Sequence, residues 1–298
     1  TINNLDDFSE NGLVNPSLVG VGFQLEDHEV DGEAGRPVRS AYEGNELTLG
    51  YFTTAGNFNF GVALGLTDLQ LESLPDAGNN NFFVNEIQGD GLNIAFSGKK
   101  DWERWSAIAL LGLGEQSMNG IRRFTEDSPN SPLPKTSAFD VTSSFIRISI
   151  QYLLADSSQW KIPAFVSLGY DLLEADGFDE VDVTGNAGDD VDLDSFEDEI
   201  PFAELGITFI YQGMEKMTPA LRLAIIQDLG DDIIELPWSN GPFSVVSEVN
   251  DPTQTSFYGE FSLSFELADF WTLTPEVDYI SSDSYSGVSG NMFLNYQF

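Results

Sequence analysis

The sequence predicts an all-β protein, a transmembrane antiparallel up-and-down β-barrel of about twelve strands with both termini on the periplasmic side of an outer membrane. Three observations predict this class. Segments with period-two alternation recur along the whole chain, most of them are longer than soluble strands, and their connections alternate between long and short. Convincing helical stretches are hard to find.

The alternating segments are mostly about 9–14 residues long, whereas soluble strands average about 5–6 residues and a tilted strand that crosses a bilayer needs about 9–11. The lengths therefore favour a membrane. The expected strands lie at 17–25, 45–54, 57–67, 90–98, 103–114, 142–154, 159–172, 201–212, 216–228, 255–267, 270–281 and 287–298.

Alternation within the segments fits two architectures. In 255–267, 270–279 and 287–298, apolar residues occupy one set of alternate positions and mostly polar residues the other. A soluble β-sandwich would bury the apolar face in a core, whereas a membrane barrel turns that face to lipid and the polar face to the lumen. Alternation alone leaves both possibilities open.

The connections separate the two architectures, because single-chain outer-membrane barrels combine short periplasmic turns with long extracellular loops. A Greek-key sandwich has no reason to alternate so strictly, although a soluble all-β binding protein stays as an outside alternative. The short connections are Thr54–Asn57, Lys99–Trp102, Ala155–Ser158, Gly213–Glu215 and Ala268–Asp269, and the long ones are 26–44, 68–89, 115–141, 173–200 and 229–254, with a modest last one at 282–286.

Composition excludes several function classes. Of 298 residues, 12 are Lys or Arg and 49 are Asp or Glu, so the net charge of −37 argues against a nucleic-acid partner. The chain has no Cys and a single His, which removes disulfides, Cys-based metal sites and most His-dependent catalysis. It has no 18-residue apolar run and no leader-like start, so we expect export with a cleaved signal peptide.

The last segment carries a family-level signal. GNMFLNYQF ends in Phe298, with Tyr296 and Leu294 two and four residues earlier. It resembles the terminal strand by which bacterial outer-membrane barrels are recognised, so Tyr296 and Phe298 are the expected assembly signal. The resemblance implies a Gram-negative outer membrane, with the lipid bilayer, lipopolysaccharide and the barrel-assembly machinery as partners.

The nearest narrower resemblance is to the translocator domain of autotransporters, in the stretches IPAFVSLGYDL, MTPALRLAIIQDLG and SGNMFLNYQF. Two features depart from that pattern. Nothing N-terminal resembles a passenger, and residues 1–16 make a poor pore-plugging helix, since Gly12 interrupts it and Pro16 ends it. We therefore expect a short periplasmic segment at 1–16 and one porin-like barrel domain at 17–298.

Catalytic and metal sites are not expected. His28, in LEDHEVDGE, is interpreted as a solvated loop residue, because Ser17 lies a whole strand away and Ser40 lies deep in the same loop. The acidic stretch near 190 is not an EF-hand, since Ser195 and Pro201 replace the required Gly and Glu. Weak Ca²⁺ or Mg²⁺ binding remains an alternative to a solvated acidic face, through Asp189, Asp190, Asp192, Asp194 and Glu197.

The lumen is the expected functional region, because Arg or Lys facing lipid at the midplane costs about 2–4 kcal/mol. The charges form either a transverse field across a water-filled pore or ion pairs that close a narrow barrel. Inward glycines leave lumen volume unfilled or serve barrel curvature. The residues expected to line the pore are Arg104, Arg147, Lys161, Arg222, Glu204, Glu260, Glu266, Glu276 and Asp278.

The leading hypothesis is a narrow, passive channel for ions or small solutes, with cation preference caused by the acidic loops. The alternatives are an autotransporter or other secretion anchor, and a plugged barrel that acts in adhesion or surface structure. We expect no enzymatic activity and no cofactor. The sequence leaves open the solute, the state of the lumen, a homo-oligomeric assembly, and whether the acidity reflects function or a saline habitat.

Overall fold

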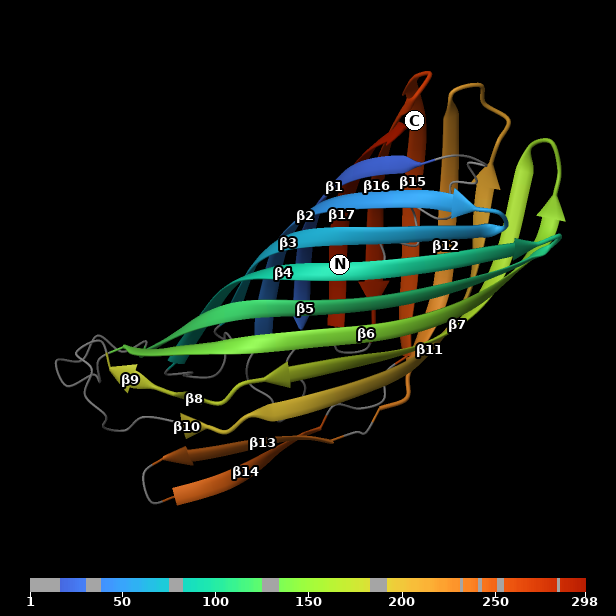
Figure 1. The fold of residues 1–298 in the computed structure, drawn as a ribbon. Coiled ribbons are helices and arrows are strands. Elements are labelled where there is room, and N and C mark those ends of the chain that lie inside the picture. Colours follow the sequence, from blue (N-terminus) through green and yellow to red (C-terminus); the bar gives the residue numbers. More distant parts are fainter. Residues whose placement is uncertain are drawn as a thin grey trace.

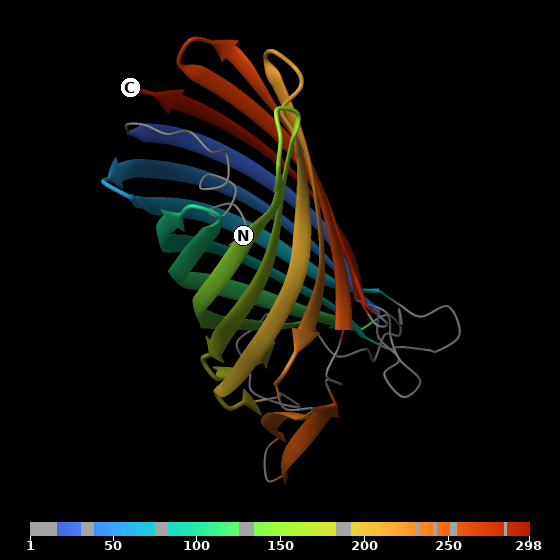
Figure 2. The ribbon, with the colours of Figure 1, turned by 90° about the vertical axis from the view of Figure 1, so that its right-hand side faces the viewer.

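The computed structural model describes residues 17–30, 39–74, 83–124, 134–182, 192–230, 233–240, 243–250, 255–282 and 285–298. Its main element is a closed ring of twelve antiparallel strands, in which β5 pairs with β6 to complete the circle (Figures 1 and 2). The prediction of a closed, antiparallel, twelve-stranded barrel is confirmed.

The barrel strands are 11 to 22 residues long. In chain order they are β1 (Leu18–Val30), β2 (Arg39–Ala55), β3 (Phe58–Leu74), β4 (Phe83–Trp102), β5 (Trp105–Phe124), β6 (Lys135–Asp156), β7 (Trp160–Ala175), β11 (Phe196–Tyr211), β12 (Met217–Asp228), β15 (Thr255–Ala268), β16 (Trp271–Ser281) and β17 (Tyr285–Gln297).

Five short strands lie beyond the barrel. β8 (Phe178–Asp179), β10 (Asp192–Leu193), β13 (Ile233–Asn240) and β14 (Phe243–Asn250) form a separate four-stranded sheet, which lies at the end of the barrel away from the short turns (Figure 1). β9 (Val181–Asp182) pairs with the start of β6. Two connections predicted as long loops therefore contain secondary structure of their own.

Most strands extend further into the long connections than the sequence predicts. For example, the predicted strand 142–154 is β6, which begins at Lys135. Beyond the spanning part the outer face becomes polar, as at Ser117 and Asp140, which pair between β5 and β6, so the apolar outer face that marks a spanning strand ends before the strand does. One turn is also displaced. It lies at Glu103–Arg104 rather than Lys99–Trp102, and Glu103 adopts a left-handed φ of 45°.

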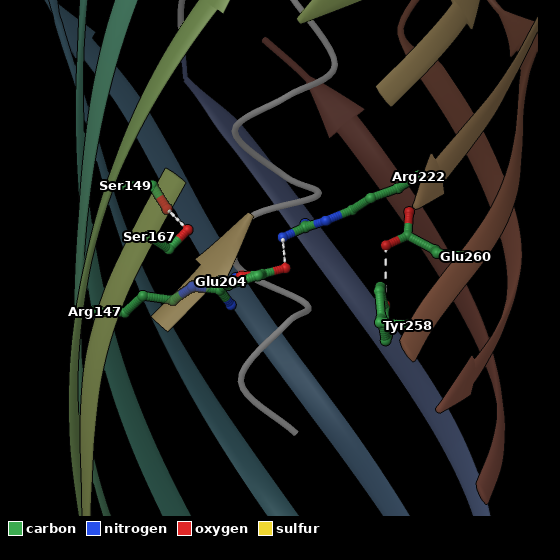
Figure 3. A network of polar contacts seen from close by, with 7 residues as sticks. All are labelled: Arg147, Ser149, Ser167, Glu204, Arg222, Tyr258 and Glu260. Atoms are coloured by element: carbon green, nitrogen blue, oxygen red, sulfur yellow. Dashed lines mark hydrogen bonds and ion pairs between the residues drawn. The ribbon is translucent and has the colours of Figure 1, made fainter. Parts of the chain in front are cut away.

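The barrel wall has an apolar outer face. Arg147 on β6 points into the barrel (Figure 3), so its neighbours Ile146 and Ile148 point outward, and these are 48% and 54% exposed. On β5 the outward apolar residues run from Trp105 to Leu113, which matches the roughly 9–11 residues of a tilted bilayer-spanning strand. Among the described residues, no helix is long and apolar enough to cross a membrane.

The inner face contains aromatic rings that lie over glycines of the neighbouring strand. A Cβ added to Gly112 would stand 1.7 Å from the ring of Phe145, and one added to Gly61 would stand 2.3 Å from Phe52. In each pair, the ring and the glycine stand directly opposite each other on neighbouring strands. These two glycines allow the rings to pack flat against the wall. One interpretation of the sequence was that inward glycines leave lumen volume unfilled, but at these two positions the rings fill it.

We expect Gly112→Val to impair barrel assembly, because the new side chain must displace Phe145 from the wall. The measurement is the folded fraction of the outer-membrane protein, read from the mobility difference between unheated and boiled samples on a denaturing gel. Gly98→Val is the matched control, since a Cβ at Gly98 meets nothing within 4 Å. Equal folded fractions for the two variants would contradict the packing argument.

Candidate functional site

The candidate site is the polar interior of the barrel. Six of the residues predicted to line the pore have buried side chains on five different strands, with 3–9% of their surface exposed. They lie on the face opposite the exposed apolar residues. These six residues are Arg147, Glu204, Arg222, Glu260, Glu276 and Asp278.

The other three predicted residues lie near the short-turn end. Arg104 is in the exposed turn between β4 and β5, where its carbonyl oxygen accepts a hydrogen bond from the Leu153 amide. Lys161 is the second residue of β7, and Glu266 is exposed near the end of β15. The structure therefore does not bring these three residues to the central network described next.

Glu204 is the centre of a buried ion-pair network (Figure 3). Its carboxylate accepts a hydrogen bond from Arg147 of β6 through one oxygen and from Arg222 of β12, at 3.1 Å, through the other. All three residues have side chains no more than 8% exposed. Because a buried carboxylate in contact with two guanidinium groups offsets much of their desolvation, the three charges stabilise one another.

Aromatic rings hold the two arginines in place. The Arg222 guanidinium lies 4.4 Å from the Phe165 ring centroid and 5.8 Å from that of Tyr258, and Arg147 lies 6.0 Å from Phe202. Tyr258 in turn donates a hydrogen bond of 3.0 Å to Glu260. Cation–π contacts of this kind strengthen when they are desolvated, so the rings add to the network rather than only filling space.

A second group of side chains, which we call the acidic wall, consists of Glu260, Glu276 and Asp278. Glu260 and Asp278 face each other in register between β15 and β16. The amide nitrogen of Asn291 donates to Glu276 at 2.9 Å and to Asp278 at 3.1 Å, and Ser289 donates to Asp278 at 2.9 Å. Amide and hydroxyl donors thus partly compensate carboxylates that would otherwise repel one another.

Sequence reasoning missed some interior residues. Glu46 of β2 is 5% exposed and accepts hydrogen bonds from Thr48, at 2.5 Å, and Asn93, at 3.4 Å. The signal was available, because Glu46, Thr48 and Gly50 alternate along one predicted strand. Asn291 was predicted to lie on the polar face, but its two contacts depend on a strand register that one sequence does not reveal.

The prediction of a solvated loop for His28 is wrong. His28 lies in β1, its side chain is 12% exposed, and its ring packs over Gly287 of β17 and 5.6 Å from the ring of Tyr42. Its Nε2 is 3.7 Å from Glu26. Beyond the membrane, β1 continues with polar residues on both faces, so this part of the strand shows no alternation of apolar and polar residues by which it could be predicted.

The residues predicted to bind a divalent cation do not form a common site in the part of the chain that the structure describes. Asp189 and Asp190 lie outside the described residues. Asp192 pairs with Asp179 and Ser239 in the small sheet, Asp194 is exposed, and Glu197 pairs with Glu174 between β11 and β7. Within the described ranges, no three His, Cys, Asp or Glu side chains form a group that could hold a metal ion.

The C-terminal aromatic residues lie on the outer face at the short-turn end. The Tyr296 ring is 4.8 Å from Trp271 and 6.2 Å from Phe298, measured between centroids. The Phe298 amide donates to the Ser17 carbonyl at 3.1 Å, so the last residue helps to close the seam between β17 and β1. The assembly role of Tyr296 and Phe298 stays a prediction.

Comparison of the sequence with known protein families agrees with this closed twelve-stranded ring and its charged interior. The profile of the autotransporter β-domain family matches residues 29–280. The chain belongs to the autotransporter β-domain family. This membership places the barrel in a bacterial outer membrane.

Solved structures show the same fold at low sequence identity. The translocator domain of the autotransporter NalP from Neisseria meningitidis is 15% identical, with a TM-score of 0.78 over 99% of this chain and 93% of that one. The transport unit of AIDA-I from Escherichia coli is 10% identical, with a TM-score of 0.64 over 97% and 92%. The β-domain of the Bordetella autotransporter BrkA is 13% identical, with a TM-score of 0.62 over 95% and 100%.

No curated protein matches this sequence.

We expect Glu204→Leu to destabilise the barrel strongly, because it leaves two buried guanidinium groups without their shared carboxylate. Breaking a buried ion pair typically costs about 3–5 kcal/mol. The measurement is the free energy of unfolding by urea in lipid vesicles. Glu266→Leu, at the exposed end of β15, is the control and should change this free energy far less. Equal values for the two variants would show that the network contributes little.

Proposed function

We propose that this barrel is the membrane-embedded translocator of an autotransporter, which carries a covalently linked polypeptide segment across the outer membrane and then anchors it there. The family match over residues 29–280 carries the proposal, and the solved structures similar to this chain include a domain described as a translocator. This function was the alternative to a channel in the sequence analysis, and family membership favours it over the channel.

The chemistry of the interior supports passage of an extended chain. A polypeptide in transit exposes backbone N–H and C=O groups that need hydrogen-bond partners. The interior offers hydroxyl, amide and carboxylate groups on several strands. Among the described residues, the side-chain oxygens of Thr67, Thr208 and Asn295 are buried with no hydrogen-bond partner. Such oxygens can accept hydrogen bonds from the amides of a passing segment when that segment replaces the side chains that cover them.

We expect a bulky inward residue to reduce translocation while an outward one does not. The assay uses the full chain with an epitope-tagged segment fused before Thr1 and measures digestion of the tag by protease added to intact cells. Thr67→Trp, on the inner face, should lower surface display at least tenfold. Leu66→Trp, on the adjacent outward position that is 58% exposed, should leave it unchanged.

Assembly of both variants is checked from gel mobility before and after boiling, so that a folding defect is not taken for a transport defect. If Thr67→Trp does not assemble, Thr208→Leu provides a smaller obstruction on the inner face. An assembled inner-face variant that displays the tag as well as the unmodified chain would contradict the proposal.

A cation-preferring channel is a second candidate, because carboxylates outnumber cations among the buried side chains. The described residues include six buried carboxylates and three buried cations. Without Glu180, which lies between β8 and β9 beyond the barrel, five buried carboxylates still outnumber three cations, and such an excess in a pore concentrates cations and repels anions. The carboxylates are Glu46, Glu180, Glu204, Glu260, Glu276 and Asp278, and the cations are Lys135, Arg147 and Arg222.

We expect any open state of the barrel to prefer cations, and Glu276→Gln to weaken that preference by removing one negative charge from the acidic wall. The measurement is the reversal potential of single channels in a planar bilayer under a salt gradient. Glu266→Gln is the control near the turn and should change it less. Anion selectivity would exclude this candidate, and a silent inserted barrel would favour a plugged anchor or adhesive barrel.

A further inference from the structure

We propose that the outer wall of the barrel, over strands β4 to β7, binds one glycolipid of the outer leaflet. These four strands are consecutive neighbours in the ring (Figure 1). A cavity of about 460 Å³ opens on their outward face, a size within the usual range for ligand sites. Its lining includes Leu92, Leu113, Glu115, Thr142, Ser144 and Glu174.

The cavity lies on the lipid side of the wall and not in the lumen. Arg147 of β6 points inward, so Thr142 and Ser144, at the opposite parity on the same strand, point outward. The leucines of the lining agree, because Leu92 and Leu113 are 55% and 53% exposed, as are other lipid-facing residues. A ligand from the membrane therefore reaches the cavity directly.

Side-chain size explains why the wall is hollow at this point. Ser144 stands in register with Leu113 of β5 on one side and with Leu172 of β7 on the other. One step further from the turns, Thr142 stands between Glu115 and Glu174 in the same way. Two short side chains on β6 thus form the floor of a groove between longer side chains on both neighbours.

The groove crosses the upper boundary of the apolar belt. On β5 the outward residues change from Leu111 and Leu113 to Glu115 and Ser117 within two positions. Long loops of outer-membrane barrels face outward from the cell, so this boundary is at the headgroups of the outer leaflet. The lower half of the groove can hold part of an acyl chain, and its upper half meets the headgroup.

The upper half selects the headgroup chemistry. Thr142 Oγ1 donates to Glu174 Oε2 at 3.4 Å, and Glu174 stands opposite Glu197 in the register of β7 and β11. Carboxylates repel a phosphate in direct contact and accept hydrogen bonds from hydroxyl groups. The occupant with matching chemistry is therefore a glycolipid whose sugar hydroxyls donate to these carboxylates, with its phosphates directed away from Glu115 and Glu174 and one acyl chain in the lower half of the groove.

The test uses the full chain extracted from outer membranes in mild detergent, with deep-rough lipopolysaccharide as the probe and native mass spectrometry as the readout. We expect one lipid molecule to stay bound to the unmodified barrel through detergent washing. Ser144→Leu, which fills the floor of the groove, should reduce the bound fraction at least tenfold. Ala109→Leu adds the same bulk to the outward face of β5 away from the groove and should have no effect.

Glu174→Gln and chelation with EDTA separate hydroxyl recognition from a cation-bridged phosphate. We expect the Gln variant to lose bound lipid severalfold and EDTA to leave binding to the unmodified barrel unchanged. Loss of lipid with EDTA and none with Glu174→Gln would overturn the assignment. Equal retention by the Ser144→Leu and Ala109→Leu variants would also overturn it, because it would show only non-specific lipid around the barrel.

Discussion

The structure depends on one constraint, namely that backbone polar groups in hydrocarbon need partners within the protein. An open sheet would leave an edge of N–H and C=O groups in lipid at a cost of several kcal/mol each. The twelve-stranded ring removes the edge, and the β1–β17 seam has thirteen residue pairs in continuous register. The outward apolar face and the inward polar face follow, since closure fixes which side of every strand meets lipid.

Closure of the barrel also brings many charged side chains together in the interior, where each needs a partner. Side chains that cannot face lipid are forced into a limited volume, and many of them are charged. Glu204 satisfies two arginines at once, with Phe165 and Tyr258 beside Arg222. Next to this network, where Glu260 stands in register with Arg222, the acidic wall depends on Asn291 and Ser289 as neutral donors. The lumen therefore combines an aromatic-flanked ion-pair network with an adjoining group of carboxylates.

Much of the fold could be predicted from the sequence, because the lipid-facing residues of each spanning strand are apolar and recur at every second position. The upper strand ends could not, since residues such as Ser117 and Asp140 are polar and exposed on strands outside the bilayer. The alternation of inward and outward positions along each strand predicted that Arg147 and Glu204 face inward. Their pairing could not be predicted, because they lie on β6 and β11 with β7 between them, and contact depends on strand stagger and side-chain rotamers. The strands resemble the autotransporter family, whereas residues 1–16 depart from its pattern and favoured a porin-like barrel instead.

The unequal strand lengths give the barrel an oblique mouth. β6 has 22 residues and β16 has 11, so the wall around β4 to β6 extends well beyond the hairpin of β16 and β17 (Figure 1). The mouth of the lumen is therefore bounded by a tall wall on the side of β4 to β6 and by a low wall on the side of β16 and β17. Under the proposed translocator function, an emerging segment would therefore leave sideways over the low side, along the membrane surface, rather than straight upward.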